Sequence, residues 1–235
     1  MRQRWTTFTA KVLGKKIGRV LARRRILRNA RAKEKVLIAA HEAVLRAYRS
    51  AERLNLRHSM SIHRVSIFLL NANRDLQVSV ADMLTSRNWW LRKFLARNMA
   101  LLLYELDFSK VMGKQFRSAI NFFSPPRAFR DELATNLKAL RRLHATLRLE
   151  FERIRNNTIA HRDADAMRQY RMIRALDEMT IARRCGEFFE TAEPLIKQLI
   201  VLTTTSSELH HLLNQVIGRK AFRRDISTRK SPHER

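Results

Sequence analysis

No proline occurs among the first 124 residues of this 235-residue chain, and the whole chain has only four prolines and five glycines. Proline breaks helices because it lacks a backbone N–H, and glycine favours turns because it adopts backbone angles that other residues avoid. An all-β fold needs frequent turns and therefore many of both residues. Their scarcity predicts an all-α protein with long helices.

Apolar residues recur every three or four positions along several stretches, which gives each predicted helix one apolar face. Three of these stripes begin at Leu37, Ile62 and Leu91. The most regular one consists of Leu133, Leu137, Leu140, His144, Leu147, Phe151 and Ile154. Amphipathic helices with short connections are typical of an antiparallel helical bundle. Apolar residues make up 45% of the chain, enough to form a buried core.

The helix boundaries are marked by proline and by acidic capping residues. Ser124 precedes two prolines and leaves the α-helical region, so a firm boundary is expected there. Asp163 and Asp165 are both candidates to cap a helix that runs to about residue 189. Pro194 is expected to start or kink the next helix.

The charge of the chain is strongly positive, with 48 basic and 21 acidic residues and a formal net charge of +27. Residues 1–35 carry 13 basic residues and one acid, a net charge of +12, which predicts a basic arm. The pattern then predicts a bundle over 36–205, and a C-terminal helix end with a basic tail over 206–235. The other 200 residues carry 35 basic and 20 acidic groups, so the body is basic too. The electrostatic field of these positive charges attracts polyanions.

Nucleic acid is the first candidate partner for the arm, an anionic membrane surface the second, and an organelle-targeting role the third. A basic tail that only keeps the chain soluble is the plain alternative. The RNA-contacting residues expected in the arm are Lys15, Lys16, Arg23, Arg24 and Arg25.

Several classes of protein and site are excluded by what the sequence lacks. The single cysteine, Cys185, rules out a disulfide framework and cysteine-based metal sites, and its spacing predicts a small core residue. No nucleotide-binding glycine loop, serine-hydrolase elbow or zinc-protease motif occurs. His210 and His211 are adjacent and would point about 100° apart on a helix, so they are not expected to form a metal site. With these motifs missing, no cofactor is expected either. Trp89 and Trp90 can stack on bases, but adjacent aromatics at a helix start are more typical of packing.

No apolar stretch is long enough to span a membrane, and the N-terminus lacks the apolar core of a signal peptide. These features predict a cytoplasmic protein.

One segment, residues 155–163, places polar groups where the most regular stripe would place apolar ones. Continuing that stripe by four and then three residues reaches Thr158 and His161. In an unbroken helix, Arg155 and His161 are separated by about 9 Å of rise and about 120° of rotation. Either the helix is distorted here, or the two groups meet across two copies of the chain. Asp163 can cap the following helix or orient His161.

The segment resembles the defining motif of HEPN domains, an arginine followed by a polar residue and, after a short spacing, a histidine. Here Arg155 is followed by Asn156, and five residues separate Arg155 from His161. The string IRNNTIAHRD, residues 154–163, is similar to the abortive-infection branch, as is RNMALLLYEL, residues 97–106. The resemblance covers about residues 60–205.

The resemblance implies a small all-α bundle that cleaves RNA without a metal or cofactor, in a toxin–antitoxin or phage-defence system. It implies a homodimer whose two motifs form one cleft, and an antitoxin protein as a possible partner. His161 would act as general acid or base, Arg155 would hold the phosphate, and Asn156 would position the backbone or the arginine. Arg162 would contact RNA.

Two other interpretations stay open. His161 can be a core histidine at a helix end, with Arg155 and Asp163 forming an ordinary ion pair or caps. HEPN domains also include non-catalytic members, so the chain can be a basic helical module that binds RNA or a partner protein. A third hypothesis is a peripheral membrane protein attached through the arm.

Overall fold

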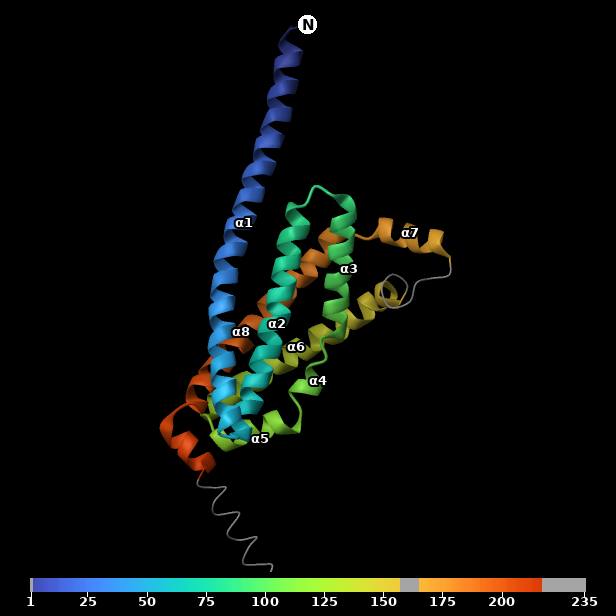
Figure 1. The fold of residues 1–235 in the computed structure, drawn as a ribbon. Coiled ribbons are helices and arrows are strands. Elements are labelled where there is room, and N and C mark those ends of the chain that lie inside the picture. Colours follow the sequence, from blue (N-terminus) through green and yellow to red (C-terminus); the bar gives the residue numbers. More distant parts are fainter. Residues whose placement is uncertain (1, 157–164, 217–235) are drawn as a thin grey trace, which may run out of the picture. The chain divides into compact units, whose positions relative to one another are not determined.

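The computed structural model describes residues 2–156 and 165–216, with side chains for all of these except residues 2–22 and 26. These residues form helices and short connections, without a strand among them, so the predicted all-α helical bundle is confirmed. Figure 1 shows the order of the helices along the chain. They are α1 (Arg2–Arg53), α2 (Arg57–Thr85), α3 (Trp89–Glu105), α4 (Phe108–Val111), α5 (Lys114–Phe123), α6 (Arg127–Ile154), α7 (Ala166–Ala175) and α8 (Glu178–Ser206). Residues 209–216 are also helical.

None of the described helices is both long enough and apolar enough to cross a membrane. Helix α1 continues through residue 35, so the predicted basic arm and the segment after it belong to the same helix.

Two predicted helix boundaries are found at the expected residues. Ser124 ends α5 in the left-handed conformation, with φ of 47°, and its N–H donates to the carbonyl of Ile120. Asp165 caps α7, because its carboxylate accepts the backbone N–H of Arg168 at 2.9 Å. The alternative cap, Asp163, lies outside the described residues.

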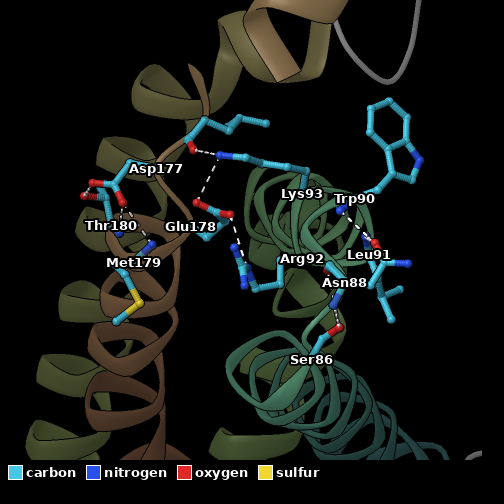
Figure 2. A network of polar contacts seen from close by, with 11 residues as sticks. Ser86, Asn88, Trp90, Leu91, Arg92, Lys93, Asp177, Glu178, Met179 and Thr180 are labelled. Carbon is cyan, nitrogen blue, oxygen red and sulfur yellow. Dashed lines mark hydrogen bonds and ion pairs between the residues drawn. The ribbon is translucent and has the colours of Figure 1, made fainter. Parts of the chain in front are cut away.

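The helix predicted to continue to about residue 189 is interrupted, so that expectation is wrong. Helix α7 ends at Ala175, and Asp177 starts α8 two residues later. Its carboxylate accepts the N–H of Met179 at 3.0 Å and the hydroxyl of Thr180 at 2.7 Å (Figure 2). An aspartate side chain competes for free backbone N–H groups, which favours a new helix start over continuation. The hydrogen bond from the Thr180 hydroxyl is the main cause that lowers the pKa of Asp177.

Pro194 does not start a helix. It lies inside α8, which has 29 residues. A proline at this position removes the hydrogen bond to the carbonyl four residues earlier, that of Glu190. The buried side chains on both sides of it, Ala192 and Leu195, show that packing keeps the helix in place despite the missing bond.

The described chain forms two compact units, and α1, α2, α6 and α8 contribute a part to each. Unit 1 comprises residues 1–38, 73–105 and 147–187. In it, the end of α2 and α3 form an antiparallel helical hairpin, joined by residues 86–88 (Figure 1). The unit's buried apolar residues include Leu76, Met83, Ala96, Met99, Leu103, Leu147, Phe151, Ile173, Ile181 and Cys185.

Cys185 is a fully buried core residue of unit 1, as predicted. Its Sγ lies 3.7 Å from the Sδ of Met99, which brings α8 against α3. Burial raises the pKa of the Cys185 thiol to about 12, so the thiol is protonated at neutral pH.

Unit 2 comprises residues 39–72, 106–146 and 188–235, and its core contains several polar groups. Gln215 donates to the hydroxyl of Ser59 at 2.9 Å, and this hydroxyl donates to the carbonyl of Ser206 at 3.3 Å. These bonds attach the last described helix to the start of α2. His63 is also buried, and its burial lowers the pKa to about 4, so the imidazole is neutral at pH 7.

Replacing the exposed Pro194 by alanine is expected to stabilise the protein by about 1–3 kcal/mol. Proline costs about 3 kcal/mol relative to alanine inside a helix, while its stiffness in the unfolded chain offsets about 0.4–1 kcal/mol of that. Urea unfolding followed by circular dichroism measures the change. Glu190→Ala, an exposed change on the same helix, is the control and should alter stability by less than about 0.5 kcal/mol. A less stable Pro194→Ala protein would contradict the expectation.

Candidate functional site around Arg155

The predicted motif is described only in its first part. Arg155 and Asn156 lie directly after α6, whereas His161, Arg162 and Asp163 lie outside the described residues. The described part of the candidate site therefore consists of Arg155 and the residues that surround it in unit 1.

The helical turn changes form at the start of the motif. Helix α6 ends at Ile154, and Arg155 and Asn156 have π-helical backbone, which is wider than an α-helical turn. Such turns are rare and frequent at functional sites. Distortion of the helix was one of the two alternatives that the spacing of Arg155 and His161 left open. Asn156 and Asn157 explain it in part, because asparagine competes for backbone hydrogen bonds.

The Arg155 guanidinium is held on three sides by groups of unit 1. Its Nε lies 3.5 Å from Oε1 of Glu105, an ion pair whose geometry is not that of a hydrogen bond. Its Nη1 donates to Oδ1 of Asn156 at 3.1 Å. Its Cζ lies 5.6 Å from the ring centroid of Tyr104, within the range of a cation–π contact. About a third of the side chain remains exposed, although its Nε is buried.

A second guanidinium shares the same ring. Arg148 lies on α6 two turns before Arg155, and its Cζ is 5.3 Å from the ring centroid of Tyr104. Its side chain is exposed. Two guanidinium groups around one tyrosine concentrate positive charge beside the end of α6.

The last part of α6 is attached to α8 by a second ion-pair group. Arg184 of α8 contacts the carboxylate of Glu150 at 2.8 Å and that of Glu187 at 2.7 Å. Hydrogen bonds to Glu187 and then to Glu150 raise the pKa of Arg184. Because Glu150 is five residues before Arg155, this contact fixes the helix from which the motif emerges.

The other end of α3 is anchored by the buried ammonium of Lys93. Its Nζ donates to the carbonyl of Leu176 and to Oε2 of Glu178, the latter at 3.0 Å (Figure 2). Nε of Arg92 lies 3.6 Å from Oε1 of the same carboxylate. Burial alone would raise the pKa of Glu178, but the hydrogen bonds from its own backbone and Lys93 and the two positive charges lower it overall.

Helix α3 begins with a group of exposed apolar side chains, which we call the aromatic surface of α3. Trp89, Trp90, Leu91 and Phe94 are each between 41% and 45% exposed. Cζ of Arg97 lies 5.8 Å from the ring centroid of Trp90 and 5.9 Å from that of Phe94. Figure 2 shows Trp90 extending away from the Lys93–Glu178 pair.

Trp89 and Trp90 pack only in part, because each is 43% exposed while their rings contact each other edge-on with centroids 5.3 Å apart. Asn88 fixes their direction, since its side chain accepts the N–H groups of Trp90 and Leu91 and starts the helix.

The arm residues predicted to contact RNA are placed only in part. Arg23, Arg24 and Arg25 are exposed on α1. Lys15 and Lys16 lie in α1, but their side chains are outside those that the structure describes.

Unit 2 has a cationic pocket of about 510 Å³ that the sequence reasoning missed. Arg57, Arg64 and Lys114 line it together with His58, and none of the residues that line it is acidic. The signal was hard to find because Lys114 lies fifty residues or more after Arg57 and Arg64 in the sequence.

Comparison of the chain with protein-family models, with curated proteins and with solved structures gave no match. Any assignment to the HEPN superfamily therefore depends on the motif itself and on the surroundings of Arg155.

The Lys93–Glu178 pair predicts a specific dependence of stability on pH. The pKa of Glu178 is lower in the folded protein than its ordinary value of 4.5, so the folded state binds fewer protons than the unfolded state. The resulting stabilisation is complete above about pH 4.5 and disappears as the pH falls through the folded pKa. Glu178→Gln should thus lower the free energy of unfolding at pH 7 and have a much smaller effect at acidic pH.

Urea unfolding at several pH values measures this difference. Glu152→Gln removes an exposed carboxylate near the end of α6 and serves as the control, with a small and nearly constant effect expected. An equally large effect of Glu178→Gln at pH 3 and pH 7 would show that its charge does not stabilise the fold.

Proposed function

We propose that this chain is an RNA-binding protein and a metal-independent endoribonuclease of the HEPN type. The observation that carries the proposal is the placement of Arg155. Its guanidinium is half-buried at a π-helical turn, oriented by Glu105, Asn156 and Tyr104, and still partly exposed. An arginine held in this way is suited to bind a phosphate, because its planar fork is oriented before the anion arrives.

The chemistry requires few other groups because RNA supplies its own nucleophile. The 2′-oxygen attacks the adjacent phosphorus, a new O–P bond forms, and the bond to the 5′-oxygen breaks. Arg155 would stabilise the charge on the phosphate, and His161 would transfer protons, a role suited to an imidazole whose ordinary pKa is about 6.5. Asn156, whose oxygen already accepts a hydrogen bond from Arg155, would keep the guanidinium oriented.

The charge and the surface support binding to RNA. The net charge of +27 favours polyanions over neutral or basic partners. The aromatic surface of α3 combines exposed rings with the Arg97 guanidinium, a combination that binds single strands through stacking and charge. In unit 2, the cationic pocket offers a further place for phosphate groups.

The proposal includes a homodimer, because one Arg155 and one His161 from each copy would then form a shared cleft. An antitoxin protein that covers this cleft, and a role in phage defence, belong to the same proposal. Both follow from the resemblance of residues 154–163 to the abortive-infection branch.

RNA cleavage in the presence of a chelator tests the catalytic part. Wild-type protein should cleave RNA under these conditions, and Arg155→Ala and His161→Ala should each reduce the rate by about 10²-fold or more, since general acid–base help contributes about 10²–10⁴. Arg148→Ala is the matched control, because it removes a guanidinium from the same helix and the same tyrosine ring but leaves the motif intact.

Circular dichroism of each variant confirms that it is folded. If Arg155→Ala and His161→Ala cleave as fast as wild type, or if Arg148→Ala loses as much activity as they do, the motif is not the catalytic site.

The aromatic surface of α3 favours a second candidate function, a non-catalytic module that binds single-stranded RNA. Trp90→Ala should weaken binding of an unstructured RNA by about 5-fold to 150-fold, because stacking of one base contributes about 1–3 kcal/mol. Leu91→Ala, which removes a similarly exposed but non-aromatic side chain, should change the dissociation constant by less than about threefold. Fluorescence anisotropy with a labelled RNA at fixed salt measures both.

Equal losses in the Trp90→Ala and Leu91→Ala proteins would indicate a general apolar contact and contradict base stacking. RNA binding that persists in His161→Ala while cleavage is absent from wild type would favour the non-catalytic module over the nuclease.

A further inference from the structure

Three potential metal ligands converge where the last described helix begins. Ligand atoms of Glu208, His210 and His211 all lie within 4.8 Å of one another. The Nδ1 of His210 is 3.6 Å from Oε2 of Glu208. The ring centroids of the two histidines are 3.8 Å apart, with an angle of 40° between the rings. All three residues belong to unit 2.

This arrangement differs from the expectation that adjacent histidines on a helix point apart. The argument from 100° per residue holds inside a helix, where the preceding turn excludes some side-chain rotamers. Here the carbonyl of Glu208 accepts the N–H of Leu212 at 3.0 Å, so the helix begins at this point. Side chains in a first turn have no preceding turn against them, and His210 and His211 can rotate toward each other.

The backbone that carries the three residues is held by the core of unit 2. Nε2 of Gln215 donates to the carbonyl of His211 at 3.4 Å and to the hydroxyl of Ser59 at 2.9 Å. The ring of Phe123 contacts the His211 ring edge-on, with centroids 5.2 Å apart. His211 is therefore partly buried and oriented, whereas Glu208 and His210 are exposed and free to adjust.

We propose that Glu208, His210 and His211 form a binding site for a late first-row transition-metal dication, with Zn²⁺ as the leading candidate. Two imidazole nitrogens and one carboxylate oxygen are a ligand set that Zn²⁺ takes in proteins, with a fourth position left for water. At bond lengths of about 2.0–2.1 Å, tetrahedral ligands lie roughly 3.3 Å apart. The three atoms lie within 4.8 Å of one another, so binding would require the two exposed side chains to rotate slightly toward the ion.

The ligand set also selects the class of metal. Mg²⁺ and Ca²⁺ prefer six or more oxygen ligands, and this site offers one carboxylate. Imidazole nitrogen suits Zn²⁺, Ni²⁺ and Cu²⁺. The positive charge of the chain opposes any cation, but at physiological ionic strength charges farther than about 8 Å are largely screened.

The inference is independent of the proposed nuclease. The site lies in unit 2, whereas Arg155 lies in unit 1, and the nuclease chemistry uses no metal. A bound ion would join the residues that follow α8 to the first turn of the next helix, and it would stabilise the folded state in proportion to the logarithm of its free concentration.

Zinc titration of the untagged full-length chain by isothermal calorimetry tests the proposal. Wild-type protein should bind one Zn²⁺ per chain with a dissociation constant on the order of micromolar. The double variant His210→Asn/His211→Asn should lose this binding event, and Glu208→Gln should weaken it at least tenfold. His144→Asn, which removes a half-buried histidine on α6 whose ring contacts Phe108, is the matched control in unit 2 and should bind as wild type does.

Cobalt supplies a second readout that reports the ligands directly. Co²⁺ added to wild-type protein should give visible absorption bands of a nitrogen–oxygen site of low coordination number, and these bands should be absent from the double variant. Thermal unfolding should shift upward with Zn²⁺ in wild type and His144→Asn but not in the double variant. Failure of wild type to bind Zn²⁺ at millimolar concentration, or binding that survives in the double variant, would overturn the proposal.

Discussion

The buried ammonium of Lys93 is the constraint on which the geometry of unit 1 depends. A buried charge is tolerated only when it is paired and hydrogen-bonded, so Lys93 requires the carbonyl of Leu176 and the carboxylate of Glu178 next to it. Both partners lie at the connection between α7 and α8. The pair therefore fixes where that connection meets α3.

Helix α3 links this anchor to the candidate site. Lys93 lies near its beginning, whereas Tyr104 and Glu105 at its end hold the Arg155 guanidinium. A rigid helix transmits position between its two ends, so the pair at Lys93 contributes to the orientation of Arg155 about 18 Å of helix rise away. The aromatic surface of α3 belongs to the same helix and is positioned by the same anchor.

The scarcity of acidic residues gives those in unit 1 particular importance. Glu105, Glu150 and Glu178 each neutralise a cation that lies between helices, namely Arg155, Arg184 and Lys93. Most of the other cations whose side chains the structure describes are exposed to solvent, among them Arg23, Arg24 and Arg25 on α1. Such a division explains how a chain with a net charge of +27 can still fold and yet present a surface that attracts polyanions.

The sequence by itself determined the all-α class, the boundary at Ser124, the cap at Asp165 and the burial of Cys185, because these depend on local periodicity, backbone preference and capping. Only the tertiary structure decided the partners of Arg155, since Tyr104 and Glu105 lie about fifty residues away from it. The tertiary structure alone also decided two further features: the exposure of Trp89 and Trp90, and the convergence of Glu208, His210 and His211. Local spacing predicts which face of a helix a residue occupies. The contacts of that face depend on the neighbouring helices and on the position of the residue in its own helix.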